Sequence, residues 1–84
     1  MYECLITFRS VMPAQRMEAL LQRRGIGCTV RRTPKWMEVQ GCGYSLMLPC
    51  SYVPEAIRLM GEKQIPYRKI YRQSADGTLE EMRL

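Results

Sequence analysis

Residues 2–8, YECLITF, alternate between two faces, which predicts a β-strand with one strongly apolar side. That side carries Tyr2, Cys4, Ile6 and Phe8. Similar segments predict three further strands, over residues 27–33 (GCTVRRT), 44–48 (YSLML) and 67–72 (YRKIYR). In the third of the four strands, the alternation places one apolar set on a single face: Tyr44, Leu46 and Leu48.

Apolar residues recur at helical spacing in two segments that lie between these strands. We expect the first helix to follow Ser10, to carry Pro13 in its first turn, and to end at Gly25 in a left-handed cap. Its apolar face consists of Ala14, Met17, Leu20 and Leu21. We expect Ser51 to cap the second helix, with Pro54 near its first turn. The apolar stripe of that helix consists of Ala56, Ile57 and Met60.

The order of these elements is β-α-β-β-α-β, which is typical of an α+β ferredoxin-like sandwich. We therefore expect a four-stranded antiparallel sheet with two helices on one face, and with the first and third strands adjacent at its centre. Each half of the chain contains a helix, then an isoleucine (Ile26 or Ile65), then a basic strand. Residues 1–73 form the predicted domain. The tail, residues 74–84, contains a turn signal, and two alternatives stay open: it folds back as an extra edge strand, or it stays loose.

The charge of the chain is unevenly distributed. The 84 residues carry a net charge of +5, while residues 1–73 hold twelve of the thirteen basic residues and five of the eight acidic ones, or +7. This pattern indicates either an acidic partner or a solvated basic face. We expect no membrane association, because no apolar run approaches the roughly 20 residues that span a bilayer. The N-terminus does not resemble a signal peptide, so the cytoplasm is the expected location.

The residue types exclude several kinds of chemistry. The chain has four cysteines, no histidine and no C-x-x-C pair, so we expect no metal and no cofactor, and no catalysis of the Ser-His-Asp or Cys-His type. Without a secretion signal we do not expect a disulfide. Cys4 and Cys28 are in phase with apolar strand residues and are predicted to lie in the core. The environment of Cys50 is left undecided.

Cys42 differs from the other cysteines because it lies between Gly41 and Gly43. Neither neighbour shields the sulfur, and glycines permit backbone shapes in which N–H groups converge on an anion. Nearby basic residues would lower the pKa of the thiol further if the hairpin brings them close: Arg31, Arg32 and Lys35. The alternative interpretation is a tight turn that contains an idle cysteine.

Four stretches together resemble the small selenium/sulfur (Se/S) carrier protein-like family. They are LITFRS at 5–10, RRGI at 23–26, Thr33-Pro34-Lys35, and Gly41-Cys42-Gly43 followed by an apolar strand. The resemblance covers residues 2–72 and implies that Cys42 is the carrier thiol, which holds sulfur or selenium as a persulfide or selenosulfide. Val39 and Gln40 depart from the family pattern, in which small hydroxyl residues precede the signature.

The first functional hypothesis is therefore a carrier rather than an enzyme, with sulfur or selenium donor and acceptor proteins as partners. A thiolate can take sulfur from a donor persulfide without an intrinsic base. The predicted site comprises Cys42 as the carrier thiol, with Gly41, Gly43, Thr33, Lys35, Arg31, Arg32 and Trp36 as binding residues. Trp36 and the two arginines would provide docking contacts.

The second hypothesis is a non-enzymatic binding module that uses its basic sheet face for RNA or protein, with Tyr67 and Tyr71 as stacking residues. Nucleic acid is disfavoured, because the aromatic pattern of RNA-recognition strands is absent and residues 67–72 fit an edge strand protected by charge equally well. A homodimer through the Trp36 loop is compatible with a carrier. The choice between sulfur and selenium stays open, as does pairing of Cys42 with Cys28 or Cys50.

Overall fold

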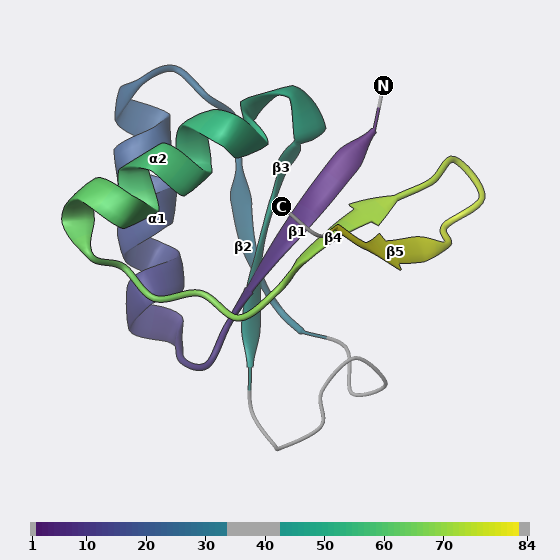
Figure 1. Cartoon of the computed structure of the whole chain (residues 1–84), viewed down its shortest axis with the longest axis horizontal. Coiled ribbons are helices and arrows are strands. Elements are labelled where there is room, and N and C mark those ends of the chain that lie inside the picture. Colours follow the sequence, from purple (N-terminus) through teal and green to yellow (C-terminus); the bar gives the residue numbers. More distant parts are fainter. Residues whose placement is uncertain (1, 34–42, 83–84) are drawn as a thin grey trace.

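The computed structural model describes residues 2–33 and 43–82, and these form an α+β structure with two helices and a five-stranded antiparallel sheet (Figure 1). The elements in chain order are β1 (Glu3–Phe8), α1 (Val11–Arg23), β2 (Thr29–Arg32), β3 (Tyr44–Pro49), the 3-10 turn η2 (Cys50–Tyr52), α2 (Val53–Lys63), β4 (Ile70–Gln73) and β5 (Leu79–Glu81).

The strands lie in the order β2-β3-β1-β4-β5, so β1 pairs with β3 on one side and with β4 on the other. The predicted adjacency of the first and third strands is confirmed. In this pairing Ile6 lies opposite Leu46, and Phe8 lies opposite Tyr44. These pairs place the C-terminal end of β1 beside the N-terminal end of β3, where the segment predicted to carry the Gly-Cys-Gly signature rejoins the sheet.

The expectation of a four-stranded sheet is wrong, because part of the tail forms β5 against β4. The turn between these strands is stabilised locally: the Asp76 carboxylate accepts a hydrogen bond from the Thr78 N–H at 2.9 Å, and Gly77 adopts a φ of 89°. Glycine adopts this left-handed conformation without steric penalty. β4 is therefore an internal strand, and the edge-strand interpretation of residues 67–72 does not hold.

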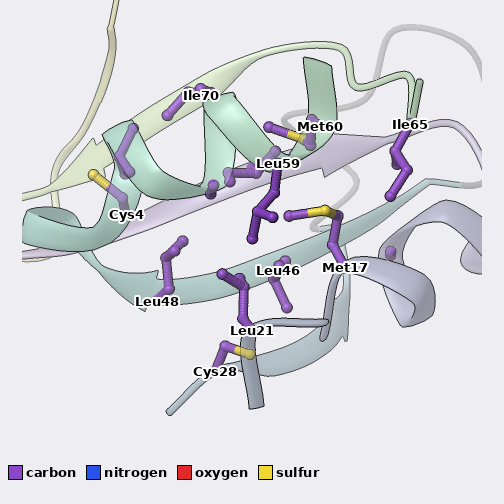
Figure 2. Close-up of a cluster of buried hydrophobic side chains, with 14 of the residues drawn as sticks. Cys4, Met17, Leu21, Cys28, Leu46, Leu48, Leu59, Met60, Ile65 and Ile70 are labelled. Carbon is purple, nitrogen blue, oxygen red and sulfur yellow. The ribbon is translucent and has the colours of Figure 1, made fainter. Parts of the chain in front are cut away.

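Both helices pack on the face of the sheet that carries the even-numbered residues of β1, and the core lies between them (Figures 1 and 2). Cys4, Ile6 and Phe8 are at most 1% exposed, as the alternation predicts. Helix and strand side chains close the core around them: Met17, Leu21, Leu46, Leu48, Leu59 and Met60. Burial of these side chains stabilises the fold by about 1.5–3 kcal/mol each, before the entropy of folding is subtracted.

The opposite face of β1 is also buried, which the sequence pattern did not indicate. Leu5 is 6% exposed and Thr7 is 8% exposed, and Ser45, opposite Thr7 in β3, is 1% exposed. The part of the sheet around Ser45 is thus not an open polar surface.

The helix ends match the sequence expectations except at the cap of α2. Gly25 has a φ of 78°, and its N–H donates to the carbonyl oxygen of Gln22, so α1 ends in the predicted left-handed turn. Pro54 lies in the first turn of α2, also as predicted. Ser51 does not cap α2: it lies within η2, and the helix begins after Tyr52. Cys50 already starts a helical turn directly after the extended Pro49, which moves Ser51 inside the turn.

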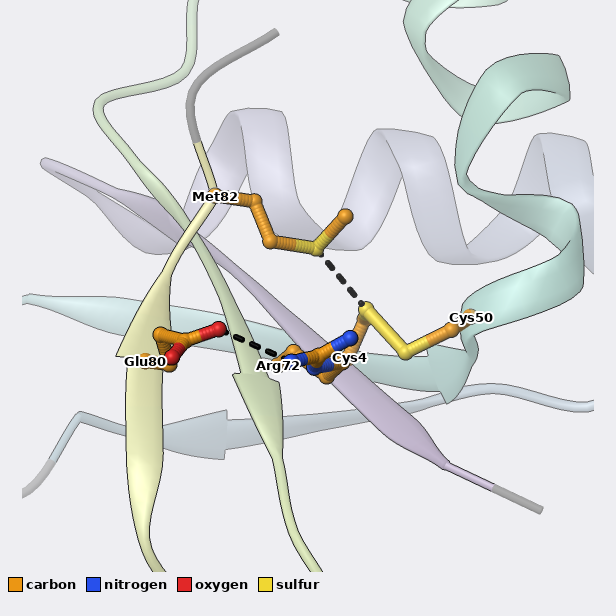
Figure 3. Close-up of a disulfide and its surroundings, with 5 residues drawn as sticks. All are labelled: Cys4, Cys50, Arg72, Glu80 and Met82. Carbon is orange, nitrogen blue, oxygen red and sulfur yellow. Dashed lines mark hydrogen bonds and ion pairs between the residues drawn. A yellow bond between two sulfur atoms is a disulfide. The ribbon is translucent and has the colours of Figure 1, made fainter.

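Cys4 and Cys50 form a disulfide, so the expectation of no disulfide is wrong (Figure 3). The register explains the pairing: Glu3 lies opposite Pro49, and the Cys50 N–H donates to the carbonyl oxygen of Tyr2 at 3.0 Å. These contacts bring the Cα atoms of the two cysteines within 5.0 Å of each other, inside the range that a disulfide bridges. Cys4 also lies in the core, as predicted.

Within residues 2–33 and 43–82, neither helix has the length and apolar character needed to cross a bilayer.

Candidate functional site

The candidate site is the base of the loop that connects β2 to β3. The two strands pair as far as Arg32 opposite Tyr44, and the ladder continues by one bond, in which the Thr33 N–H donates to the Gly43 carbonyl oxygen at 3.0 Å. Residues 33 and 43 therefore lie side by side, and the loop starts and ends at one point of the sheet (Figure 1).

Four of the predicted site residues belong to that loop and lie outside the described residues: Lys35, Trp36, Gly41 and Cys42. Their predicted roles stay predictions. Cys42 is bonded to Gly43 in the chain, so the described residue nearest to it in sequence is part of the loop base.

Two buried hydroxyl groups mark the loop base, on Thr33 and Ser45. Thr33 is 5% exposed and Ser45 is 1% exposed, and within the described part of the chain neither Oγ atom has a hydrogen-bond partner. Both project from the same face of the sheet, because Ser45 lies opposite Arg31 and Thr33 follows Arg31 by two residues. We call Thr33 and Ser45 the hydroxyl pair.

The neighbouring Thr7 shows how a hydroxyl on this face is normally satisfied. It lies opposite Ser45, and its Oγ1 atom accepts a hydrogen bond from the Lys69 N–H at 3.0 Å and donates to the Lys69 carbonyl oxygen at 3.2 Å. A buried hydroxyl without such a partner costs about 1–3 kcal/mol of stability. Within the described residues, the hydroxyl pair therefore keeps hydrogen-bonding capacity that no protein group there satisfies.

The predicted arginines are divided between the two faces of the sheet. Arg31 is exposed and shares the face of the hydroxyl pair, whereas Arg32, one residue further along β2, shares the opposite face with Tyr44. The structure thus brings together Arg31, Thr33 and Gly43 of the predicted set and separates Arg32 from them. A cation on the side of the hydroxyl pair favours an anionic group at the loop base.

Ser45 is not among the residues that the sequence singles out. It alternates with Tyr44 and Leu46, and this pattern is typical of a polar, solvent-facing position in a strand. Its burial is seen only in the tertiary structure.

The other cysteines are poor candidates for a reactive thiol. Cys4 and Cys50 are joined to each other. Cys28 is buried, and desolvation, assisted by the nearby Glu18 carboxylate, raises the pKa of its thiol above the ordinary value. A thiol with a raised pKa is protonated at neutral pH and is a weak nucleophile. The prediction that Cys28 is a core residue is confirmed.

Conventional metal ligands do not converge anywhere in the described residues: no three side chains among Cys, Asp and Glu gather there. The described part of the site consists of hydroxyl groups, one cation and a glycine. These groups can donate hydrogen bonds to an anion and stabilise its charge, but they contain no nucleophile and no general base.

The fold and this site define a small α+β domain in which the segment between β2 and β3 leaves the sheet at Thr33 and rejoins it at Gly43. Comparison with family models gives the class: residues 3–72 match the family described as "Putative Se/S carrier protein-like", and the chain belongs to it. The resemblance noted in the sequence is thereby confirmed. Neither the curated proteins nor the solved structures contain a match to the chain.

Proposed function

We propose that this protein is a carrier that holds sulfur or selenium on Cys42, as a persulfide or a selenosulfide, and passes it between partner proteins. The family assignment supports a carrier. The observation that carries the proposal is the hydroxyl pair at the loop base, two buried donors without a partner in the described residues and close to Gly43 in the strand ladder. A chalcogen anion on Cys42 is a ligand that such donors would stabilise.

The loading step needs no cofactor and no redox partner. The Cys42 thiolate attacks the terminal sulfur of a donor persulfide, R–S–SH, and a new S–S bond forms as the donor bond breaks. The products are a persulfide on Cys42 and the donor thiolate, R–S⁻, so the electrons of the broken bond leave with the donor. Unloading is the same exchange with an acceptor thiolate. Selenium follows the same course when it replaces the terminal sulfur.

The hydroxyl pair and Arg31 have distinct roles in this proposal. Hydrogen bonds from Thr33 and Ser45 favour the charged form of the loaded group, and the Arg31 cation lowers the pKa of a thiol on its side of the sheet. Lys35 is proposed to lower the pKa of the Cys42 thiol as well, and Trp36 is a proposed docking contact for the donor and acceptor proteins. Arg32, which lies on the other face, is not part of the anion site and remains a proposed docking residue.

We also propose a more specific fold assignment. The order β2-β3-β1-β4, with two helices on one face, is consistent with a ferredoxin-like sandwich, and we propose that β5 is an addition to it. The cytoplasmic location stays a prediction. The Cys4–Cys50 disulfide is a feature more typical of oxidising compartments.

The RNA-binding alternative is not favoured. Tyr67 precedes β4 instead of lying on the sheet, and Leu5, Thr7 and Ser45 occupy the centre of the face opposite the helices and are buried. An RNA-recognition sheet needs exposed aromatic residues at such central positions.

The test is intact-protein mass spectrometry after incubation with a small-molecule persulfide donor, or with a selenosulfide donor. We expect one added sulfur or selenium on the wild-type protein and on Cys28→Ser, and none on Cys42→Ser. Equal labelling of Cys42→Ser and the wild type would refute the proposal. Thr33→Val and Ser45→Ala keep the thiol but remove the hydroxyls, and we expect the loaded form of each to decay faster than that of the wild type.

A further inference from the structure

A basic pocket lies at the same end of the sheet as the loop base. Its volume is about 630 Å³, and it is lined by Arg9, Ser10, Tyr67, Arg68 and Lys69 together with two prolines. These residues come from two segments: the connection between β1 and α1 together with the first turn of α1, and the connection between α2 and β4. We call this cavity the basic pocket.

Backbone hydrogen bonds fix the two segments beside each other. The Arg68 N–H donates to the Thr7 carbonyl oxygen at 2.7 Å, and the Thr7 N–H donates to the Lys69 carbonyl oxygen at 2.8 Å. The chain leaving α2 thus runs along the end of β1, where α1 begins (Figure 1). Since Phe8 lies opposite Tyr44, this is also the end at which β3 starts.

The described residues neutralise the charge of the basic pocket only at Lys69. No acidic side chain among the described residues lines the pocket. Lys69 lies 3.5 Å from the Glu81 carboxylate, whereas Arg9 and Arg68 have no ion pair within the described residues. Among the other described arginines some have ion-pair partners, since Arg24 and Arg58 contact Glu55 and Arg72 contacts Glu80. Two unpaired guanidinium groups on one cavity favour an anionic occupant.

The remaining lining residues indicate what kind of anion would fit. The Ser10 side chain makes no capping hydrogen bond, so its hydroxyl can donate to a ligand. Tyr67 is 40% exposed and offers a ring face. A second cavity of about 620 Å³ shares Ser10 and both prolines with the basic pocket. It adds the apolar Met12 and Ile65 together with Gln15 and Arg16. The combined surface has a cationic part and an apolar part.

We propose that the basic pocket binds a phosphorylated small molecule, with the phosphate on Arg9 and Arg68 and the apolar portion against Tyr67. The planar fork of arginine matches phosphate oxygens in a bidentate manner, and the cavity lies within the usual range of about 300–1,000 Å³ for small-molecule sites. The inference is independent of the carrier function, because none of the residues involved belongs to the Gly-Cys-Gly loop or the hydroxyl pair.

The experiment is an NMR titration of the ¹⁵N-labelled protein with phenyl phosphate, with inorganic phosphate in a second arm, at constant ionic strength. We expect saturable shifts of the amides of residues 9, 10 and 67–69 with both ligands, and tighter binding of phenyl phosphate. Tyr67→Leu should remove that advantage without changing the affinity for inorganic phosphate. If phenyl phosphate binds no more tightly than inorganic phosphate, the small-molecule part of the proposal is refuted.

A matched pair of variants tests the role of the arginines. Arg9→Gln combined with Arg68→Gln should weaken binding by at least about tenfold, which corresponds to the loss of one charge-assisted hydrogen bond. Arg23→Gln combined with Arg58→Gln removes the same charge from residues that do not line the pocket and should bind like the wild type. Equal weakening in both double variants, or no saturable shift at the pocket in the wild type, would overturn the proposal. Cys42→Ser should bind unchanged, which separates this result from any failure of the carrier hypothesis.

Discussion

The Cys4–Cys50 disulfide gives the most direct prediction about stability. It joins two residues that are 46 positions apart in the chain. In the chain-entropy description, closing a loop of this length raises the free energy of the unfolded state by about 4 kcal/mol. A domain of 84 residues has a total unfolding free energy of about 4–13 kcal/mol. The disulfide is therefore expected to supply a large part of the stability of this fold.

The perturbation is Cys50→Ala, compared with the wild type in the presence and absence of a thiol-free phosphine reductant. Cys50 is half-buried, whereas Cys4 is fully buried, so truncation of Cys50 disturbs the core less. Thermal unfolding followed by far-ultraviolet circular dichroism should show a midpoint about 20 °C lower for Cys50→Ala than for the oxidised wild type. Reductant should lower the wild-type midpoint by a similar amount and leave Cys50→Ala unaffected.

Cys28→Ser is the matched control, because it removes another cysteine but retains the disulfide. It should keep the full response to reductant. A wild-type midpoint that does not respond to reductant, when mass spectrometry shows both cysteines reduced, would refute the stabilising role. A Cys50→Ala midpoint within a few degrees of the oxidised wild type would refute it independently.

Four further predictions concern single residues. Thr33→Val should leave the free energy of unfolding unchanged or raise it in urea denaturation, because it removes a buried hydroxyl without a described partner; a large loss would show that the hydroxyl is satisfied. Leu46→Ala should lower that free energy by about 2–5 kcal/mol, since Leu46 is fully buried. Cys28 should resist iodoacetamide at neutral pH and react as the pH rises above 9 or when urea is added, because its pKa is raised. Hydrogen bonds that Asp76 accepts from Thr78 lower the pKa of the Asp76 carboxyl group. Asp76→Ala should therefore lower the thermal midpoint at neutral pH, and the difference from the wild type should disappear as the pH falls through the lowered pKa.

Much of the local structure could be predicted from short-range patterns. The alternation in β1 and β3 identified the side chains that face the helices, and Gly25 and Pro54 marked helix boundaries where the structure has them. These features depend on a few neighbouring residues and on the fixed periods of strands and helices. Ser51 is the exception, because its position relative to η2 depended on where the preceding extended segment stopped.

The candidate site could be predicted only in part. Thr33 and Gly43 were singled out by the Thr-Pro step and the Gly-Cys-Gly signature, and the structure places the two residues side by side. Ser45 could not be placed, since its position in an alternating strand is typical of a solvent-facing residue and its burial is a feature of the tertiary structure. The basic pocket was not predicted either, because Arg9 and Arg68 are far apart in the sequence and meet through backbone hydrogen bonds between Thr7 and the segment before β4.

By itself, the sequence determined the order of the elements, the apolar faces of the strands and helices, and the glycine-flanked Cys42, because each of these is encoded by neighbouring residues. The tertiary structure alone decided that Cys4 pairs with Cys50, that Thr33 and Ser45 are both buried, and that β5 pairs with the outer edge of β4. The physical reason is the register of the sheet. Strand pairing sets which distant residues become neighbours, and nothing in the local sequence specifies that register until the whole core is assembled.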